Sequence, residues 1–248
     1  NKFCPILIAM LIAYHPQTLL AEPPNSKLVT SDIRTDLNTV KLHMVFDGES
    51  ENDADLWQHE FRKKMHNLLG ESRPPENFTA KVVESKQLID HVCLSIELSA
   101  PGHHTLPLYL LTPNEMKDAP LRPGILAVHG HGDYGHHTVA GRHDIEGVSE
   151  AIEKANYDYG LQFVRRGYIV AVPCMIPFGQ RVDKQSYGGN DPCAVTFVRM
   201  QALGKLLITE NIRILRWSIS YLQSLPTVNK EKIGCAGLSY GGRMTMMV

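Results

Sequence analysis

The chain has 248 residues, 43% of them apolar, and a formal net charge of −1. This length and composition are typical of a globular protein with one large domain, or with one domain and an appendage. The near-zero charge argues against nucleic acid or an anionic membrane surface as a partner. The sequence contains no internal repeat, which argues against a repeat architecture.

Residues 1–21 have the pattern of a signal peptide. Lys2 is followed by an apolar run over residues 3–14, and the small residue Ala21 precedes a polar, Pro-rich stretch. The apolar run is short for a membrane span. We therefore expect cleavage after Ala21, export to the periplasm or the medium, and no stable membrane insertion afterwards. A retained N-terminal anchor and a buried helix are the alternatives.

An exported protein can form disulfides, so the cysteines bear on its stability. Cys93 and Cys235 lie in strand-like apolar runs and are expected to be buried thiols. Cys174 and Cys193 flank a loop rich in Gly and Pro. They could pair, and the sequence does not decide between a disulfide and two free thiols.

Residues 22–77 are expected to form a linker followed by a helix. The polar stretch 22–54 indicates the linker, with a short strand or helix at 40–46 as its only regular element. A helix is predicted over 55–69, ending at Gly70, because large apolar residues recur there at helical spacing. We expect this stripe to pack against the main domain. Its members are Trp57, Phe61, Met65 and Leu68.

Residues 78–248 have the pattern of an α/β domain. The runs 81–98 and 105–111 are rich in β-forming residues and are separated by a Pro-Gly pair, which predicts an antiparallel hairpin. The continuous apolar runs 124–129 and 168–173 predict strands that are covered on both faces.

Helices are predicted between and after these strands. One is expected over 156–166, and a second from Pro192, capped by Asp191, to about Leu225, with a break at Gly204. A further strand then leads to Ser239. This alternation predicts a mostly parallel sheet with helices on both faces, where ligands bind at the carboxyl ends of the strands.

The segment 232–242 combines a strand, a Gly-x-Ser-x-Gly turn centred on Ser239, and the start of a helix. Such a turn holds its serine in a strained conformation and lifts the hydroxyl clear of the sheet. Gly237 and Gly241 avoid a collision where two chain segments crowd the turn, and the helix N-terminus favours developing negative charge. We therefore predict Ser239 as a nucleophile; the alternative is a plain Gly-rich turn.

A second motif, His-Gly-His-Gly-Asp, follows the strand 124–129. In a serine hydrolase of this layout, the loop after that strand supplies one backbone N–H of the oxyanion hole, and the residue after the nucleophile supplies the other. We expect these donors to be the amides of His131 and Tyr240, with Gly132 as a weaker candidate than His131.

The same loop also has a metal-binding interpretation. His129, His131 and Asp133 make up most of a His-x-His-x-Asp-His zinc motif, and imidazole and carboxylate are suitable zinc ligands. The final position is Tyr134 instead of His, and a zinc enzyme would leave Ser239 unexplained. A zinc-dependent hydrolase is therefore the weaker alternative, and no metal or other cofactor is expected.

Over residues 80–248 the chain resembles α/β-hydrolases of the dienelactone hydrolase and acetyl xylan esterase-like group. The matching pieces are the loop 129–132, the segment 160–168, the arginine-containing helix that ends at 225, and the elbow 232–242. The resemblance implies an α/β-hydrolase fold and a Ser-acid-His triad in that chain order.

This sequence departs from the pattern, because none of its 12 histidines follows Ser239. We expect the chain to be a fragment whose domain is incomplete after the elbow, with the acid and the histidine beyond Val248. A serine without a general base is a poor nucleophile, so these residues alone are predicted to be inactive. The last strand is also expected to leave an unpaired edge that is prone to aggregation.

The sequence thus predicts an exported serine hydrolase that acts on a carboxylic ester through an acyl-enzyme. The resemblance suggests a small-molecule or carbohydrate ester, including an acetyl ester of a carbohydrate. A non-catalytic protein on the same fold is a further alternative. Arg181 and Asp183 are expected to lie in a solvated loop instead of lining the pocket. The oligomeric state is not indicated.

Overall fold

The computed structural model of the chain describes residues 29–114, 120–182 and 184–248. The predicted signal peptide, residues 1–21, lies outside the described residues. The chain divides into two compact units, of which the first ends at His59 and the second begins at Glu60. None of the described helices has both the length and the apolar character needed to cross a bilayer.

The first unit contains α1 (Val29–Thr39) and the beginning of α2 (Glu51–Leu69). The linker prediction was therefore wrong at α1, whose first turn carries the favourable charge of Asp32. The short element expected at 40–46 is absent. This segment instead offers a carbonyl to the Trp57 indole, which donates a hydrogen bond to Met44 O at 3.0 Å.

Helix α2 begins four residues earlier than predicted because of a reciprocal cap. The Asp53 carboxylate accepts from Ser50 N at 3.0 Å, and Ser50 Oγ accepts from Asp53 N at 3.2 Å. The expectation that the apolar stripe of this helix is core was wrong. No residue of α2 is buried, and Leu68 is 61% exposed.

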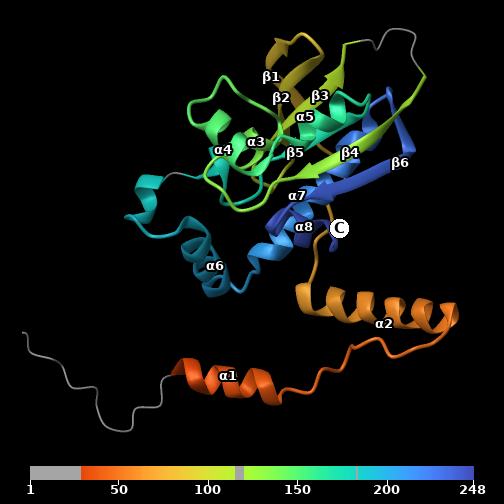
Figure 1. Cartoon of the computed structure of the whole chain (residues 1–248), viewed down its shortest axis with the longest axis vertical. Helices are drawn as coiled ribbons and strands as arrows, with labels where there is room; N and C mark the ends of the chain where they lie inside the picture. The colour runs from red at the N-terminus through yellow and green to blue at the C-terminus, as the bar shows by residue number, and fades with distance from the viewer. Residues whose placement is uncertain (1–28, 115–119, 183) are drawn as a thin grey trace, which may run out of the picture. The chain divides into compact units, whose positions relative to one another are not determined.

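The second unit is built on a six-stranded sheet with the order β1-β2-β3-β5-β4-β6 (Figure 1). The antiparallel pairs β1/β2, β2/β3 and β3/β5 and the parallel pairs β4/β5 and β4/β6 give β2, β4, β5 and β6 one common direction. The mostly parallel sheet is thus confirmed. The strands are β1 (Thr79–Gln87), β2 (His91–Ser99), β3 (Leu106–Pro113), β4 (Arg122–Val128), β5 (Ile169–Pro173) and β6 (Val228–Gly237).

The antiparallel part is larger than the predicted hairpin. The run 81–98 is not one strand but two, because the chain reverses where Leu88 N donates to His91 O at 2.9 Å. Three antiparallel strands therefore precede β4. At the other side of the sheet, β6 is the edge strand. Its exposed position explains why Cys235 is exposed and not buried as predicted.

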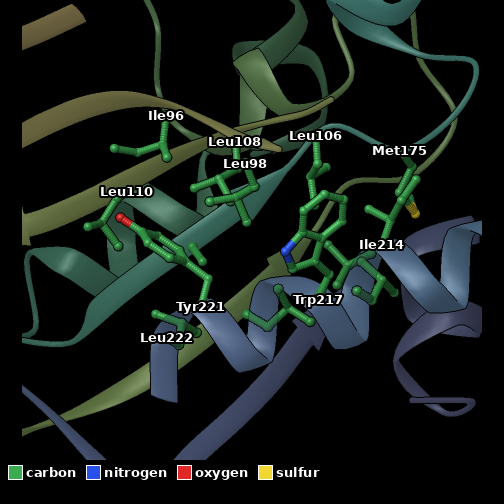
Figure 2. Close-up of a cluster of buried hydrophobic side chains, with 14 of the residues drawn as sticks. Ile96, Leu98, Leu106, Leu108, Leu110, Met175, Ile214, Trp217, Tyr221 and Leu222 are labelled. Atoms are coloured by element: carbon green, nitrogen blue, oxygen red, sulfur yellow. The ribbon is translucent and has the colours of Figure 1, made fainter. Parts of the chain in front are cut away.

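The helices of the second unit cover both faces of the sheet, as expected. Leu126 and Val128 of β4 pack with α7, whereas Ala127 between them packs with α3 and α5. Figure 2 shows the α7 side of this core, where Trp217, Tyr221 and Leu222 lie against β2 and β3. The helices are α3 (His136–Val139), α4 (Val148–Ala155), α5 (Tyr159–Val164), α6 (Pro192–Ala202), α7 (Leu207–Ser224) and α8 (Tyr240–Thr245), with the 3-10 turns η1 (Gly179–Arg181) and η2 (Lys184–Tyr187).

Some helix boundaries agree with the prediction and others do not. The helix expected over 156–166 is shorter, because α5 runs only over Tyr159–Val164. The unpredicted helix α4 precedes it and ends at Asn156, which has a left-handed conformation with φ 50°. The break at Gly204 is confirmed by its φ of 68°, which separates α6 from α7. Asp191 caps α6 as expected, accepting from Ala194 N at 2.7 Å.

The described cysteines are all free thiols, so Cys174 and Cys193 do not pair. Cys174 is buried and its Sγ donates to Phe178 O at 3.1 Å. Cys193 is half-buried, and its Sγ lies 3.6 Å from His131 Nε2. Cys93 is buried in the sheet, as predicted.

Candidate active site

The turn between β6 and α8 places Ser239 in a strained backbone conformation, with φ 57° and ψ −120°. Asn156 and Ser239 are the two residues other than glycine with positive φ in the described part of the chain. A non-glycine residue keeps such a conformation only where its surroundings enforce it, and these positions cluster at functional sites. The strand, turn and helix expected from the sequence are therefore present.

Close packing explains the two glycines that flank the serine. A Cβ at Gly237 would lie 2.5 Å from the carbonyl carbon of Gly241. A Cβ at Gly241 would lie 2.0 Å from Val128 O, at the end of β4. Such contacts are far shorter than van der Waals distances, so the elbow is pressed against the start of the His-Gly-His-Gly loop.

That loop passes beside Ser239. A Cβ at Gly130 would lie 3.2 Å from Ser239 Cβ. The Gly130 amide is already used, because it donates to the Tyr157 hydroxyl at 3.0 Å. By contrast, no described residue accepts a hydrogen bond from the amide of His131 or of Tyr240. The rings of His131 and Tyr240 lie 4.8 Å apart, so the side chains of the two residues predicted to supply oxyanion donors are neighbours.

His129 anchors this loop to the sheet. Its Nδ1–H donates to Gly130 O at 2.9 Å, and its Nε2 accepts from Met175 N at 3.0 Å. The imidazole is fully buried, and burial lowers the pKa of His129 to about 4, which keeps the ring neutral. It thus ties the end of β4 to the residues that follow β5.

The zinc alternative finds no support in this geometry. Both nitrogens of His129 are occupied by backbone groups, and the ring of His131 packs at 5.4 Å from that of Phe178. Within the described ranges, no three His, Cys, Asp or Glu side chains are arranged to hold a metal ion. His129, His131 and Asp133 thus lie in one loop, but within the described ranges their side chains are not gathered into a metal site.

Sequence reasoning missed two side chains that support the site. Besides Tyr157, the buried Asn211 of α7 donates from Nδ2 to the Tyr240 hydroxyl at 3.1 Å. The same amide donates to Ile176 O at 2.8 Å and accepts from Ile176 N at 2.9 Å. For Asn211, the one available signal in the sequence was its position as a polar residue on the apolar face of a predicted helix.

A cavity of about 390 Å³ adjoins the His-Gly-His-Gly loop. His131 and Asp133 form one wall, Phe178 follows from the segment after β5, and Cys193 comes from the first turn of α6. Arg181 does not line it; this side chain is half-buried and donates to Cys174 O at 3.2 Å, so the prediction of a solvated residue was wrong. Asp183 lies outside the described residues.

The hydroxyl of Ser239 is exposed and has no hydrogen-bond partner among the residues that the structure describes. A general base and its acidic partner are thus not assembled around it in this part of the chain. The described residues supply an exposed serine in a strained turn, a neighbouring loop whose His131 amide is unused, and a cavity that adjoins this loop.

A strained serine at the end of a parallel strand, with a donor loop after the neighbouring strand, defines the architecture of the α/β-hydrolases. The chain has this fold. A putative acetyl xylan esterase from Bacteroides fragilis superposes with a TM-score of 0.72 at 17% identity, over 92% of this chain and 58% of that one. A glucuronoyl esterase from Solibacter usitatus gives a TM-score of 0.52 at 15% identity, over 78% of this chain and 55% of that one.

No family model matches the chain. The putative hydrolase YtaP of Bacillus subtilis (strain 168) is 26% identical over 189 residues, which are 75% of this chain and 57% of that protein. The chain therefore spans less than two thirds of the length of this relative.

Proposed function

We propose that the whole protein hydrolyses carboxylic esters, with Ser239 as the nucleophile. The observation that carries the proposal is the backbone of Ser239, held at φ 57° and ψ −120° against a loop with a free amide at His131. The names of the structural neighbours, acetyl xylan esterase and glucuronoyl esterase, support an ester of a carbohydrate as the substrate class, with an acetyl ester as the first candidate.

In this mechanism Ser239 Oγ attacks the ester carbonyl carbon and forms a tetrahedral intermediate. The N–H groups of His131 and Tyr240 donate to the oxyanion that develops. A general base takes the serine proton and returns it to the alcohol oxygen as the C–O bond breaks, which leaves an acyl-enzyme. Water, deprotonated by the same base, then attacks the acyl-enzyme and releases the carboxylic acid.

The proposal assigns the base to a histidine outside the 248 residues, with an acidic partner. Two facts support this assignment: no described side chain hydrogen-bonds the Ser239 hydroxyl, and the relative YtaP is longer than the aligned region. Export of the protein is proposed in the same way, on the pattern of residues 1–21.

The test is labelling of the protein, expressed with its natural flanking sequence, by a fluorophosphonate probe, followed by mass spectrometry of the labelled peptide. We expect label on Ser239 and hydrolysis of p-nitrophenyl acetate. Ser239→Ala should abolish labelling and lower kcat by roughly 10⁴-fold or more, whereas the exposed strand residue change Ser85→Ala should alter neither. Full activity in the Ser239→Ala protein would refute the serine mechanism. An absence of both label and hydrolysis would favour a non-catalytic role.

A further inference from the structure

A second cavity lies away from the proposed active site. It has a volume of about 220 Å³ and shares no lining residue with the cavity beside the oxyanion loop. Its floor is formed by β1, β2 and β3, with Glu84 and Glu97 among the strand residues. Arg142, from the segment after α3, and Gln180, of η1, complete the wall.

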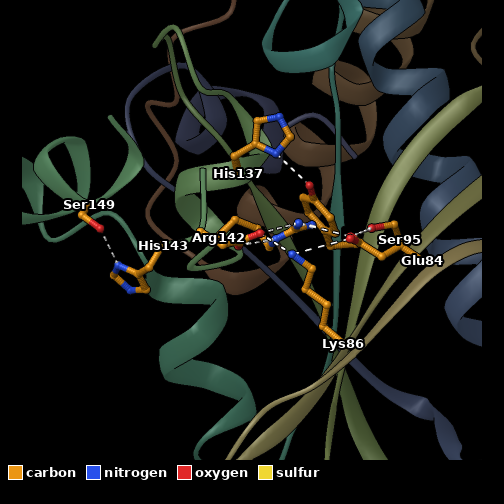
Figure 3. A network of polar contacts seen from close by, with 9 residues as sticks. Glu84, Lys86, Ser95, His137, Arg142, His143 and Ser149 are labelled. Atoms are coloured by element: carbon orange, nitrogen blue, oxygen red, sulfur yellow. Dashed lines mark hydrogen bonds and ion pairs between the residues drawn. The ribbon is translucent and has the colours of Figure 1, made fainter. Parts of the chain in front are cut away.

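The charged member of this wall is Arg142, which is only 7% exposed. Its Nε and Nη2 donate to the Asp144 carboxylate at 2.8 and 2.9 Å, and Nη2 also lies 3.1 Å from Glu84 Oε2 (Figure 3). Lys86 adds a further contact to Asp144. The remaining nitrogen, Nη1, has no hydrogen-bond partner among the described residues. An almost buried guanidinium with a spare N–H favours an acceptor in the adjoining space.

Glu97 of β2, unlike Arg142, needs a hydrogen-bond donor from a ligand. This half-buried carboxylate lines the cavity and has no hydrogen-bond partner in the described part of the chain. Glu84, by contrast, already accepts from Ser95 Oγ at 3.1 Å. The amide of Gln180 can both donate and accept. The lining therefore offers an unused donor, an unused acceptor and one group that serves as either.

The floor adds no further charge. The ring of His136 stacks on Tyr109 at a centroid distance of 4.8 Å, and burial lowers the pKa of His136 well below its ordinary value, so that the imidazole is neutral. A ligand group that only accepts, such as an anion, would leave Glu97 without a donor, and one that only donates, such as an ammonium ion, would leave Arg142 Nη1 without an acceptor. A neutral hydroxyl group meets both requirements, because it can donate to the carboxylate and accept from the guanidinium.

We propose that this cavity is a binding site for a small neutral polyhydroxy ligand the size of one sugar ring. Hydroxyl groups donate to carboxylates and accept from guanidinium N–H groups, which matches Glu97 and Arg142. Because a water molecule takes roughly 30 Å³ of liquid volume, the cavity corresponds to about seven waters, or a ligand of about ten heavy atoms. The site is separate from Ser239, so ligand binding here does not depend on ester hydrolysis.

The experiment is a saturation-transfer NMR titration of the protein with D-xylose, D-glucuronate and D-glucosamine as probes. We expect D-xylose to bind and the two charged sugars to bind at least fivefold more weakly. Glu97→Ala should weaken D-xylose about tenfold, and Gln180→Ala about threefold, because each removes one hydrogen-bonding partner. Ser239→Ala and the exposed control Glu76→Ala should leave the affinity unchanged.

Three outcomes would overturn the proposal. They are no D-xylose binding to the wild-type protein, equal affinity for D-glucuronate, and unchanged D-xylose affinity in both the Glu97→Ala and Gln180→Ala proteins. The last outcome would place the sugar elsewhere, including the cavity beside His131. Circular dichroism of both variants checks that the sheet is intact. Because Gln180 lies on a surface turn, its variant keeps the test valid if Glu97→Ala fails to fold.

Discussion

The Tyr157 hydroxyl accepts a hydrogen bond from the Gly130 amide at 3.0 Å, one residue before the proposed oxyanion donor. This contact occupies the Gly130 N–H and orients the following peptide, which carries the amide of His131. Tyr157 lies between α4 and α5 and is 27 residues from Gly130 in sequence. We therefore assign Tyr157 a positioning role toward the proposed donor His131.

The first prediction concerns this contact. Tyr157→Phe removes the acceptor but keeps the ring, so the loop loses its restraint. We expect kcat for ester hydrolysis to fall by roughly 10- to 100-fold, with little change in KM, because the lost stabilisation affects mainly the transition state. Tyr168→Phe, which also removes a half-buried tyrosine hydroxyl, is the matched control and should be close to wild type. An unchanged kcat in Tyr157→Phe would show that the contact is dispensable.

The second prediction uses the glycines of the elbow. Alanine normally stabilises a helix relative to glycine by about 0.5–1 kcal/mol. In α8 the sign should be reversed for Gly241→Ala, because the added Cβ would lie 2.0 Å from Val128 O. We expect a loss of about 3 kcal/mol or more in the free energy of unfolding.

Urea denaturation followed by circular dichroism measures this loss. Gly132→Ala is the control, since a Cβ at Gly132 would meet nothing within 4 Å. It should change the free energy of unfolding by less than about 0.5 kcal/mol. Equal stability of the two variants would contradict the crowding of the elbow by β4.

The third prediction concerns Asn211. Asn211→Leu keeps a similar volume but leaves Ile176 N and O, and the Tyr240 hydroxyl, without their partner. We expect the free energy of unfolding to fall by about 2–4 kcal/mol, because buried polar groups are costly when unpaired. Tyr240→Phe removes only one of these hydrogen bonds and should cost about 1 kcal/mol. Denaturant titrations of the two variants compare these losses; a larger loss in Tyr240→Phe would exclude the bridging role.

The fourth prediction is a loss of stability in mild acid. Burial lowers the pKa of His129 to about 4 in the folded protein, from an ordinary value of 6.5. Between these values the unfolded chain binds a proton that the folded chain does not, so stability falls as the pH falls from 6.5 to 4. The contribution of His129 is roughly 3 kcal/mol over this window. Burial also lowers the pKa of His137 to about 4, so both residues act in the same direction.

Unfolding free energies at pH 7.5, 6.0, 5.0 and 4.5 test this dependence. His129→Gln should be less stable at pH 7.5 but should show a smaller slope between pH 6 and 4.5. The exposed change Ser85→Ala, which removes no titratable group, should leave the slope unchanged. An identical slope in wild type and His129→Gln would mean that His129 is not the titrating group.

The parts of the site that were predictable are those encoded by neighbouring residues. Ser239 and its flanking glycines lie within five consecutive positions, and the His-Gly-His-Gly loop follows its strand directly. Tyr157 and Asn211 could not be found in this way. They meet Gly130 and Tyr240 across 27 and 29 residues, and a single sequence contains no local pattern for such a pair.

The errors in the fold have a similar origin. The reversal at Leu88 lacks the Gly or Pro that usually indicates a turn, so β1 and β2 were predicted as one strand. The helix α2 has an apolar stripe at helical spacing, but spacing alone does not reveal whether a neighbour covers it. The exposure of Cys235 depends on the place of β6 in the strand order, which is a property of the whole sheet.

The bridge that His129 makes from the end of β4 to Met175 has a consequence for how new substrates could be accommodated. In the proposed mechanism, the oxyanion donors and the walls of the cavity are held by different contacts. The loop that carries the proposed donor His131 is held through the buried ring of His129, whereas Phe178 and Cys193 reach the adjoining cavity from the long excursion between β5 and α7. Substitutions in that excursion beyond Met175 are therefore expected to reshape the cavity while the contact between Met175 and His129 is kept.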